Sequence, residues 1–507
     1  MCAGVGDSPP WAPEGGRSKK VPKCVGSLRN NARGFRLCDV MGPMTTRPAS
    51  KRIGFNLFEM NTVGHISHGL WRAPGNTRHR YTDIDFWQSQ AKLLEEGLFD
   101  SVFLADVIGA YDGYRDSPDT ALREAVQIPN NDPLMVIPVM AAVTTHLGFV
   151  ATFSTTYEPP FAFARRASTL DHLTRGRFGW NIVTSYLPNA ARNFGLDDEL
   201  DHTQRYDRAH EYLDVLYKLW EGSWDDAAVV RDIDGSVYTD PAHVRRINHV
   251  GEYFRVAGPH LSEPSVQRTP VLFQAGSSET GRAFAAKHAE AVFVGGSSLA
   301  DFKSNIADIH RRAEEGGRGK GSVRTLGSAV LIPGKTHADA VRKAEEYERL
   351  SSAEGYLAHA GGGSGIDFAA YSPETRIADI IASSGTSHNA ATTARYAPGA
   401  TVGDALREVT RFDRGPFFAL GTGEEIADAI EGWVAETGID GFNLRQFVTP
   451  ETVEDFVTYV VPELQKRGLY RTKYAEPTLR EHLFGAGNSR LPDTHYGARY
   501  RGGNSLA

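Results

Sequence analysis

Polar side chains recur where apolar, β-rich runs of this sequence end. Asp106 ends one such run, and a carboxylate at that depth is costly to bury without a hydrogen-bond donor. Thr152 and Ser154 alternate in another run, so both hydroxyls can lie on one face of a strand. Asn181 adds an amide in a third run. Carboxylate, hydroxyl and amide groups at successive strand ends predict a site for a polar ligand.

Two histidines, His65 and His68, lie three residues apart in the segment 61–72. This spacing could ligate a metal on a helix, but Gly64 and Gly69 predict a loop. The sequence also contains no HExxH motif and no nearby cysteine to complete a zinc site, so we expect no metal. A pH-sensitive histidine in a substrate pocket and simple packing of the loop both remain open. The position after a strand favours the pocket.

The segment 274–281 (QAGSSETG) places small residues directly before a predicted helix. Free backbone N–H groups at a helix start favour a phosphate, whereas Ser277 or Ser278 could equally be an ordinary N-cap. The segment lacks a GxxxxGK[ST] motif, so a nucleoside triphosphate site is not expected. The glycine run at 316–321 follows a helix and is interpreted as a connector. The run at 361–365 predicts a flexible loop or a lid hinge.

Eight β-rich runs alternate with helical segments from residue 51 onward, and these elements must position the polar residues. The runs cover 53–60, 101–107, 148–156, 177–185, 271–276, 291–295, 325–332 and 441–446. Because at least one helical segment joins each run to the next, we predict an α/β fold, a TIM (β/α)8 barrel over 51–475. Two large insertions are expected at about 221–270 and 351–415, the first with one hairpin. In such a barrel the chemistry lies at the C-terminal ends of the strands.

The composition is that of an ordinary globular protein, with 41% hydrophobic and 23% charged residues and a net charge of -7 among 507 residues. A mildly acidic chain without a basic block is not expected to bind nucleic acid. The longest apolar stretch, 133–143, is too short to cross a bilayer. Cys2, Cys24 and Cys38 all precede the first predicted strand, which argues against a disulfide framework and for a cytoplasmic protein.

The two ends of the chain are predicted to lie outside the barrel. Residues 1–50 are rich in Gly, Pro, Arg and Lys without apolar periodicity, and they lack the apolar core of a secretory signal. We expect a disordered extension or a start codon assigned too early, with Met44 as the alternative beginning; an organellar transit peptide stays open. Residues 476–507 are expected to form a C-terminal tail.

Six segments, in order along the chain, resemble the bacterial luciferase-like flavin monooxygenases. They are 53–72 (IGFNLFEMN to HISHGLWR), 104–106 (LAD), 151–160 (ATFSTTYEPP), 179–185 (GWNIVTS), 205–209 (RYDRA) and 274–278 (QAGSS). The likeness is closer to the branch that contains the nitrilotriacetate, EDTA, dibenzothiophene-sulfone and dimethyl-sulfide monooxygenases and a pristinamycin synthase. It covers roughly residues 53–483.

This resemblance implies a TIM barrel of the luciferase-like type that binds reduced FMN (FMNH2) as a diffusible co-substrate and uses O2. A separate NAD(P)H:flavin oxidoreductase would supply FMNH2, and a homodimer or homotetramer is expected. Carried over by motif, the flavin contacts are Asp106, Thr152, His202, Tyr206, Ser277 and Ser278, with Asn181 placed by its strand position. The catalytic candidates on the substrate side are His68, Trp71 and His388.

The implied reaction inserts one oxygen atom of O2 into a small organic substrate through a flavin C4a-(hydro)peroxide. Aromatic residues near the predicted mouth, among them Trp71, Tyr111 and Tyr157, favour an apolar or sulfur-containing substrate such as a sulfide or sulfone. An antibiotic or terpenoid precursor stays open as the substrate. The alternative functions are an F420-dependent oxidoreductase on the same barrel and a flavin-binding protein that is not itself catalytic.

Overall fold

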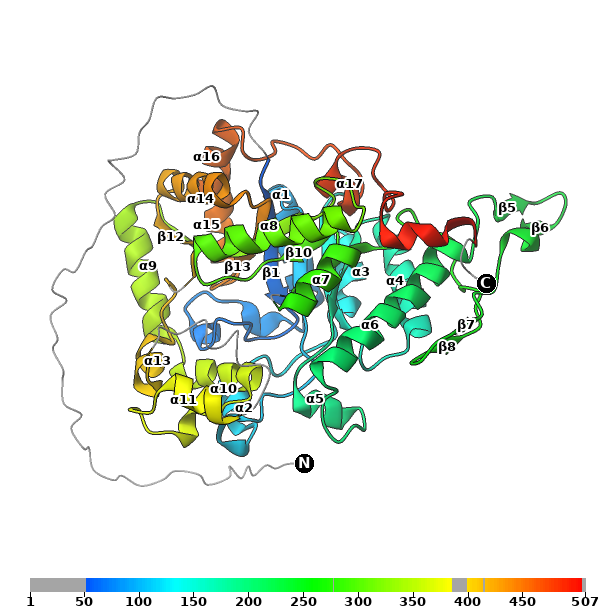
Figure 1. The fold of residues 1–507 in the computed structure, drawn as a ribbon. Helices are drawn as coiled ribbons and strands as arrows, with labels where there is room; N and C mark the ends of the chain where they lie inside the picture. Colours follow the sequence, from blue (N-terminus) through cyan, green and yellow to red (C-terminus); the bar gives the residue numbers. More distant parts are fainter. Residues whose placement is uncertain (1–51, 277, 385–398, 414, 504–507) are drawn as a thin grey trace, which may run out of the picture. The chain divides into compact units, whose positions relative to one another are not determined.

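Figure 1 shows the computed structural model, which describes residues 52–276, 278–384, 399–413 and 415–503. All of these residues belong to one compact unit, Ser50–Ala507. Parallel strands form the centre of this unit, and helices pack around them. Among the described helices, none is both long enough and apolar enough to span a membrane.

Eight parallel strands close into a barrel. They are β1 (Gly54–Met60), β2 (Ser101–Ala105), β3 (Gly148–Ser154), β4 (Phe178–Val183), β9 (Val271–Gln274), β10 (Ala291–Phe293), β11 (Arg324–Pro333) and β13 (Gly441–Arg445). Each strand pairs with the next in this order, and β13 returns to β1 where Gly441 faces Gly54. Because the barrel is closed, each of its strands pairs with a neighbouring strand on both sides. The predicted TIM barrel is confirmed, and each of the eight predicted runs overlaps one of these strands.

A layer of helices covers the outside of the barrel (Figure 1). It contains α1 (Ile84–Glu96), α3 (Pro133–Ala141), α4 (Pro160–Thr174), α6 (His202–Tyr217), α7 (Glu279–His288), α8 (Leu299–Glu315), α9 (His337–Leu350), α14 (Gly423–Thr437), α15 (Glu451–Asp455) and α16 (Val461–Lys466). Their inner faces are apolar, as in α8, where Phe302, Ile306 and Ile309 are buried at spacings of four and three residues. The predicted amphipathic helices therefore form because one stripe of each can pack on the barrel.

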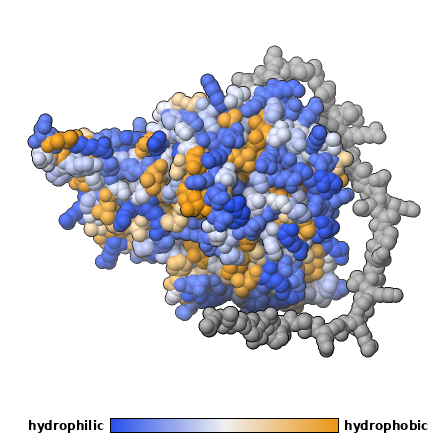
Figure 2. Space-filling view, turned by 180° about the vertical axis from the view of Figure 1, so that it is seen from behind, coloured by the Kyte–Doolittle hydropathy of each residue, from blue (hydrophilic) through white to orange (hydrophobic). Residues whose placement is uncertain are grey.

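The first insertion carries two β-hairpins, whereas the sequence predicted one. β7 (His249–Val250) pairs with β8 (Arg255–Val256) as expected, and β5 (Val229–Asp232) pairs with β6 (Val237–Thr239) in a second hairpin. Ile233, in the turn of this second hairpin, is 90% exposed. Figures 1 and 2 show the hairpin at one end of the unit, with apolar residues on its surface. Because neither face is buried, the alternation that identifies a strand is absent from its sequence.

The second insertion is helical in its described part. It contains α10 (Ala353–Ser364), α11 (Ile377–Ser384) and α13 (Val402–Glu408). The prediction of a flexible glycine loop at 361–365 is wrong, because most of this run belongs to α10. Glycine lowers helix propensity, but a Cβ at Gly362 would overlap the ring of Tyr111. Close packing of α10 therefore requires glycine at this position.

The chain beyond the last barrel helix covers the N-terminal end of the barrel. α17 (Leu479–Phe484) places the fully buried Leu479 against Gly148 and Gly179, near the starts of β3 and β4. The buried Arg480 pairs with Glu290, directly before β10, at 2.7 Å. With this end filled, the C-terminal ends of the strands are left as the end that can receive a ligand.

Candidate active site

Contacts between two loops hold Asp106 at the C-terminal end of β2. Thr62, two residues past β1, donates from Oγ1 to Pro129 O at 2.5 Å. The neighbouring Asn130 donates from Nδ2 to Asp106 Oδ1 at 2.8 Å, and it also forms a β-bridge with Thr62. Asp106 therefore lies at the end of the barrel where the sequence predicted it, with an amide donor beside its carboxyl group.

Burial raises the pKa of Asp106 to about 7. The hydrogen bond from Asn130 opposes this rise, and the negative charge of Asp132 adds to it. Because a carboxyl group with this pKa exists in both protonation states near neutral pH, Asp106 can either donate or accept a hydrogen bond toward a ligand.

An amide and a hydroxyl face one another on β3 and β4. Asn181 donates from Nδ2 to Thr152 Oγ1 at 2.9 Å, and the two buried residues are neighbours in the strand register. Asn181 Oδ1 is buried and has no hydrogen-bond partner in the described part of the chain. At the end of β3, Ser154 Oγ accepts a hydrogen bond from the hydroxyl of Ser185 at 2.8 Å. A buried acceptor without a partner is costly, so a ligand N–H or O–H at Asn181 would be favourable.

His68 is completely buried in the loop after β1. Its Nε2 lies 3.1 Å from Nδ1 of His359 on α10, while its Nδ1 has no partner among the residues that the structure describes. Burial holds the pKa of His68 well below its usual value, and the charges of His359 and Arg445 act in the same direction. His68 is therefore a neutral imidazole at physiological pH, with one ring nitrogen available to a ligand.

A buried tyrosine extends this cluster toward β4. The ring of Tyr111 lies edge-on to His359, with centroids 5.0 Å apart. Its hydroxyl donates to Gln127 Oε1 at 2.7 Å and lies 2.9 Å from the hydroxyl of Tyr186. Burial raises the pKa of Tyr111 well above its usual value, so its hydroxyl stays protonated.

Sequence reasoning missed three members of this cluster, namely His359, Gln127 and Tyr186. They come from an insertion and from loops, where no motif marks them. The one available signal was a histidine in the otherwise apolar segment 357–360. The sequence predicts Tyr111 only as an aromatic residue near the mouth, whereas its hydroxyl also contacts Gln127 and Tyr186.

The start of α7 lies across the barrel mouth from β1, because β9 is the fifth strand of the ring. Ser278 Oγ accepts a hydrogen bond from Gly281 N at 3.0 Å, so the N-cap interpretation of Ser278 is confirmed. The hydroxyl of Tyr206 lies close to that of Ser278, and the ring centroids of His202 and Tyr206 are 5.0 Å apart. A Cβ at Gly281 would lie 3.0 Å from both Tyr206 Oη and Ser278 Oγ, so glycine permits this close approach.

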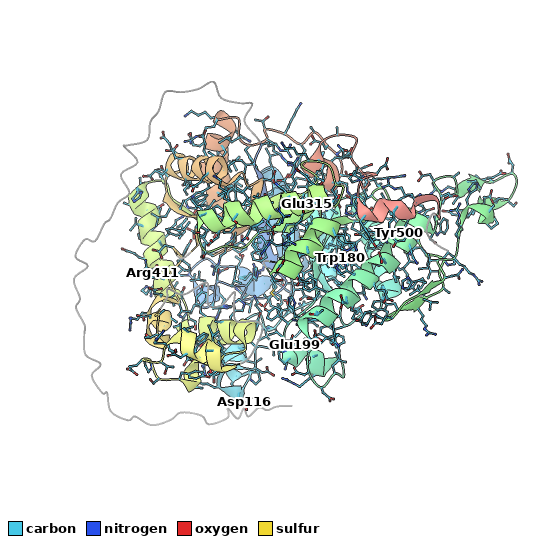
Figure 3. All side chains as sticks on the ribbon, in the orientation of Figure 1. Asp116, Trp180, Glu199, Glu315, Arg411 and Tyr500 are labelled. Atoms are coloured by element: carbon cyan, nitrogen blue, oxygen red, sulfur yellow. The ribbon has the colours of Figure 1, made fainter. Side chains whose placement is uncertain are left out.

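Arg205, which precedes Tyr206 in α6, contacts the loop that follows β4. Its buried guanidinium donates to Ser185 O at 3.0 Å and pairs with Glu199, labelled in Figure 3, at 2.6 Å. Burial, together with the charge of Arg205, lowers the pKa of His202. Two neighbouring residues of α6 thus serve two parts of the mouth, because Tyr206 lies beside the start of α7 and Arg205 contacts the residue that follows the end of β4.

Of the predicted residues that the structure describes, Trp71 lies apart from these contacts. Trp71, in η1 (Leu70–Arg72), is 41% exposed and lines, with His65, a recess of about 20 Å³ that could hold one water molecule. Ser277 and His388 lie outside the described residues. Within the described ranges, no group of three or more His, Cys, Asp or Glu side chains could hold a metal ion.

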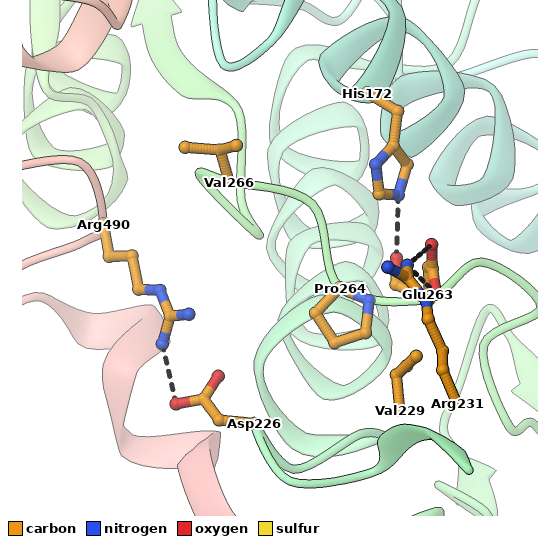
Figure 4. Close-up of a pocket in the computed structure, with 8 residues that line it drawn as sticks. All are labelled: His172, Asp226, Val229, Arg231, Glu263, Pro264, Val266 and Arg490. Atoms are coloured by element: carbon orange, nitrogen blue, oxygen red, sulfur yellow. Dashed lines mark hydrogen bonds and ion pairs between the residues drawn. The ribbon is translucent and has the colours of Figure 1, made fainter. Parts of the chain in front are cut away.

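A cavity of about 350 Å³ lies away from these residues (Figure 4). His172, near the end of α4, and Glu263, ahead of β9, place it toward the N-terminal end of the barrel. Its charged groups pair with one another, Arg490 with Asp226 at 2.9 Å and Arg231 with Glu263 at 3.2 Å. The strand C-terminal ends, with their incompletely paired polar atoms, are therefore the better candidate for chemistry.

A closed parallel barrel with polar groups gathered at its strand C-terminal ends is the architecture of a TIM-barrel enzyme. The family profile described as "Luciferase-like monooxygenase" matches residues 67–441. The chain belongs to the luciferase-like monooxygenase family and is a flavin-dependent monooxygenase. The resemblance noted in the sequence is thereby confirmed.

Several relatives match over most of their length. The long-chain alkane monooxygenase of Geobacillus thermodenitrificans (strain NG80-2) is 55% identical over 454 residues, 89% of this chain and 98% of the relative. The dimethyl-sulfide monooxygenase of Hyphomicrobium sulfonivorans is 46% identical over 452 residues, which are 89% of this chain and 94% of the relative. The crystal structure of riboflavin lyase with modified FMN and substrate riboflavin is 37% identical, with a TM-score of 0.82, and covers 89% of this chain and 100% of its own. An F420-dependent secondary alcohol dehydrogenase, at 14% identity and a TM-score of 0.50, shares the fold alone.

Replacing Asn130 by alanine is expected to raise the pKa of Asp106 further, because the hydrogen bond that stabilises the ionised carboxylate is lost. Carbon NMR of labelled aspartate measures this pKa, and Asp106→Asn assigns the signal.

Since the pKa of Asp106 lies above the ordinary 3.8, the folded state binds more protons than the unfolded state between about pH 4 and about pH 7. The free energy of unfolding is therefore expected to fall as pH rises through this range. In Asp106→Asn this part of the pH dependence is expected to disappear. A wild-type carboxyl that titrates near pH 4 would contradict the assignment.

Proposed function

We propose that this chain binds reduced FMN, received from a separate NAD(P)H:flavin oxidoreductase, and uses O2 to transfer one oxygen atom to an apolar organic substrate. Reduced flavin, when bound, supplies the two electrons that activate O2, and the protein supplies binding, orientation and a dry pocket. One observation carries the proposal. Polar groups span the barrel mouth from the start of α7 to a buried, neutral histidine, His68.

The start of α7 is suited to the FMN phosphate. The first N–H groups of a helix attract an anion, and α7 has ten residues. Tyr206 and Ser278 bring two hydroxyls to this helix start, and His202 lies beside them. Gly281 leaves the approach open, because it has no side chain to block it. Ser277, adjacent to Ser278, is retained as a phosphate contact by resemblance.

The strand ends between α7 and His68 are suited to the polar edge of the flavin ring and its ribityl chain. Asn181 Oδ1 is a buried acceptor that lacks a partner within the described residues, and Thr152 positions that amide. Asp106, with a pKa of about 7, can hold a proton where a ligand nitrogen or oxygen requires a donor. Trp71 and His388 remain proposals for the substrate side.

Apolar side chains around Tyr111 favour an apolar substrate. They come from α10, from the segment directly after α10, and from the loop and helix after β4. They include Leu187, Ala190, Leu357, Ala358, Ile366 and Phe368. An alkyl chain or an organic sulfide fits this chemistry better than a polyanion, because a charged group would lose its hydration there. A sulfide or sulfone is the first candidate from the sequence. A long-chain hydrocarbon is the second, favoured by the 55% identity to the alkane monooxygenase.

Three further features belong to the proposal. The separate reductase is supported by the absence of a nicotinamide-binding fingerprint from the sequence. A homodimer or homotetramer in the cytoplasm follows from the resemblance and from the cysteine distribution. The F420-dependent alternative is not proposed, because the relatives at high identity are named monooxygenases.

Turnover with labelled O2 tests this function. The purified chain is supplied with FMN, NADH, a generic flavin reductase and 18O2, and a medium-length alkane and dimethyl sulfide are offered in parallel. We expect one 18O atom in the product, and no product when the reductase or O2 is omitted. Product formed without O2, or with F420 in place of FMN, would contradict the proposal.

Replacing Ser278 by aspartate is expected to weaken reduced-FMN binding about tenfold or more, because it places a negative charge beside the phosphate. Aspartate caps a helix as well as serine does, so α7 itself is preserved. Ser278→Asn is the matched control, since it also caps but carries no charge. Anaerobic titration measures both affinities, and equal values for the two variants would exclude a phosphate at this helix start.

His68→Ala is expected to retain FMN binding but to release more hydrogen peroxide for each flavin consumed, because a buried hydrogen-bonding group and its packing are lost. His79→Ala, which alters an exposed histidine in the same loop region, serves as the control. Peroxide and product are measured together against NADH oxidised. An unchanged ratio in His68→Ala would remove this residue from the mechanism.

A further inference from the structure

One face of α10 meets the site through a histidine that lies between two glycines. Gly355, His359 and Gly362 are separated by four and three residues, so they share one side of the helix. His359 contacts His68 at 3.1 Å and meets the ring of Tyr111 edge-on. The two glycines therefore determine how closely this histidine approaches the buried residues of the mouth.

Neither glycine has room for a methyl group. A Cβ at Gly355 would lie 2.9 Å from Cβ of His68, and one at Gly362 would overlap the ring of Tyr111. Tyr111 cannot turn away cheaply, because it is 1% exposed and its hydroxyl contacts Gln127 and Tyr186. Since glycine lowers the stability of a helix, its presence at both positions has to be offset by the close approach that it permits.

His68 also carries a buried nitrogen that its surroundings do not satisfy. Its Nδ1 has no partner in the described part of the chain, whereas its Nε2 contacts His359. The groups that face the ring are Arg445, His65 and His359, with the ring of Tyr356 at 4.9 Å. None of these supplies a negative charge, so the imidazole stays neutral. A ligand group at Nδ1 would remove the cost of the unpaired atom.

We propose that Gly355 and Gly362 are positioning residues, which seat His359 against His68 so that His68 is held as one neutral tautomer with its Nδ1 presented to the ligand. A hydrogen bond between two neutral imidazoles needs one N–H and one lone pair, so the tautomer of each ring sets that of the other. This inference rests on the proposed monooxygenase function and deepens it. In this inference α10, in the second insertion, determines which ring nitrogen of His68 carries the proton.

Gly362→Ala tests the seating of α10. The matched control is Gly432→Ala, because Gly432 lies inside α14 with open space around it. 15N NMR of histidine-labelled, flavin-free protein reports the tautomer, and His68→Ala assigns the signal. We expect one unchanging neutral tautomer in the wild type and in Gly432→Ala from about pH 6 to about pH 8. In Gly362→Ala, the two ring nitrogens of His68 are expected to show shifts averaged between tautomers.

A second pair of variants tests the same contact without altering a glycine. His359→Asn keeps a polar group close to the position of Nδ1 and is expected to retain the single tautomer of His68. His359→Leu removes the polar group, so His68 is expected to exchange between its two neutral tautomers. These two variants answer the question even if Gly362→Ala does not fold, which circular dichroism establishes.

Turnover and tautomer together separate this inference from the proposed function. Gly362→Ala and His359→Leu are expected to lose about tenfold or more in product per flavin, with FMN affinity unchanged. If His68 keeps its wild-type tautomer in both variants, the inference is overturned even when the wild type incorporates oxygen from O2. If His68 exchanges between its tautomers in these variants but the wild type incorporates no oxygen, the proposed function fails while the positioning role stands.

Discussion

Hydrogen bonds between neighbouring strands close the barrel, and this closure brings the polar residues of the site to one place. Asp106, Asn181 and Ser278 lie far apart in the chain, and they approach one mouth only because parallel strands carry their C-terminal ends to the same end of the ring. The pairings of β10 with β11 and of β13 with β1 complete that ring. The opposite end is filled by Leu479, so the fold leaves one end for ligands.

Burial is the common cause of the electrostatics at this mouth. It lowers the pKa of His68, raises that of Tyr111 and raises that of Asp106 to about 7. In each case the low-polarity surroundings favour the uncharged form. Neutral His68 and Tyr111, together with an Asp106 that can hold a proton, suit a pocket that must bind a polar cofactor while admitting an apolar substrate and little water.

The two insertions contribute differently to the molecule. The first carries an exposed hairpin and the cavity of Figure 4, toward the N-terminal end of the barrel. The second brings α10 onto the mouth, where its apolar residues and His359 meet Tyr111 and His68. The barrel therefore supplies the polar strand ends, and the second insertion supplies much of the apolar wall and one partner of the central histidine.

Local sequence patterns predict the eight-stranded barrel, the polar strand-end residues Asp106, Thr152 and Asn181, and a candidate N-cap at Ser277 or Ser278. Alternation, helical spacing and capping depend on residues that are close together in the chain, so they can be read locally. Contacts between distant segments make 361–364 helical and bring His68 to His359, which is 291 positions away in the chain. Only the tertiary structure shows that the hairpin of β5 and β6 forms without a buried face. Close packing against the distant ring of Tyr111 overrides the weak helix propensity of glycine, and no local pattern records which distant side chain will lie opposite.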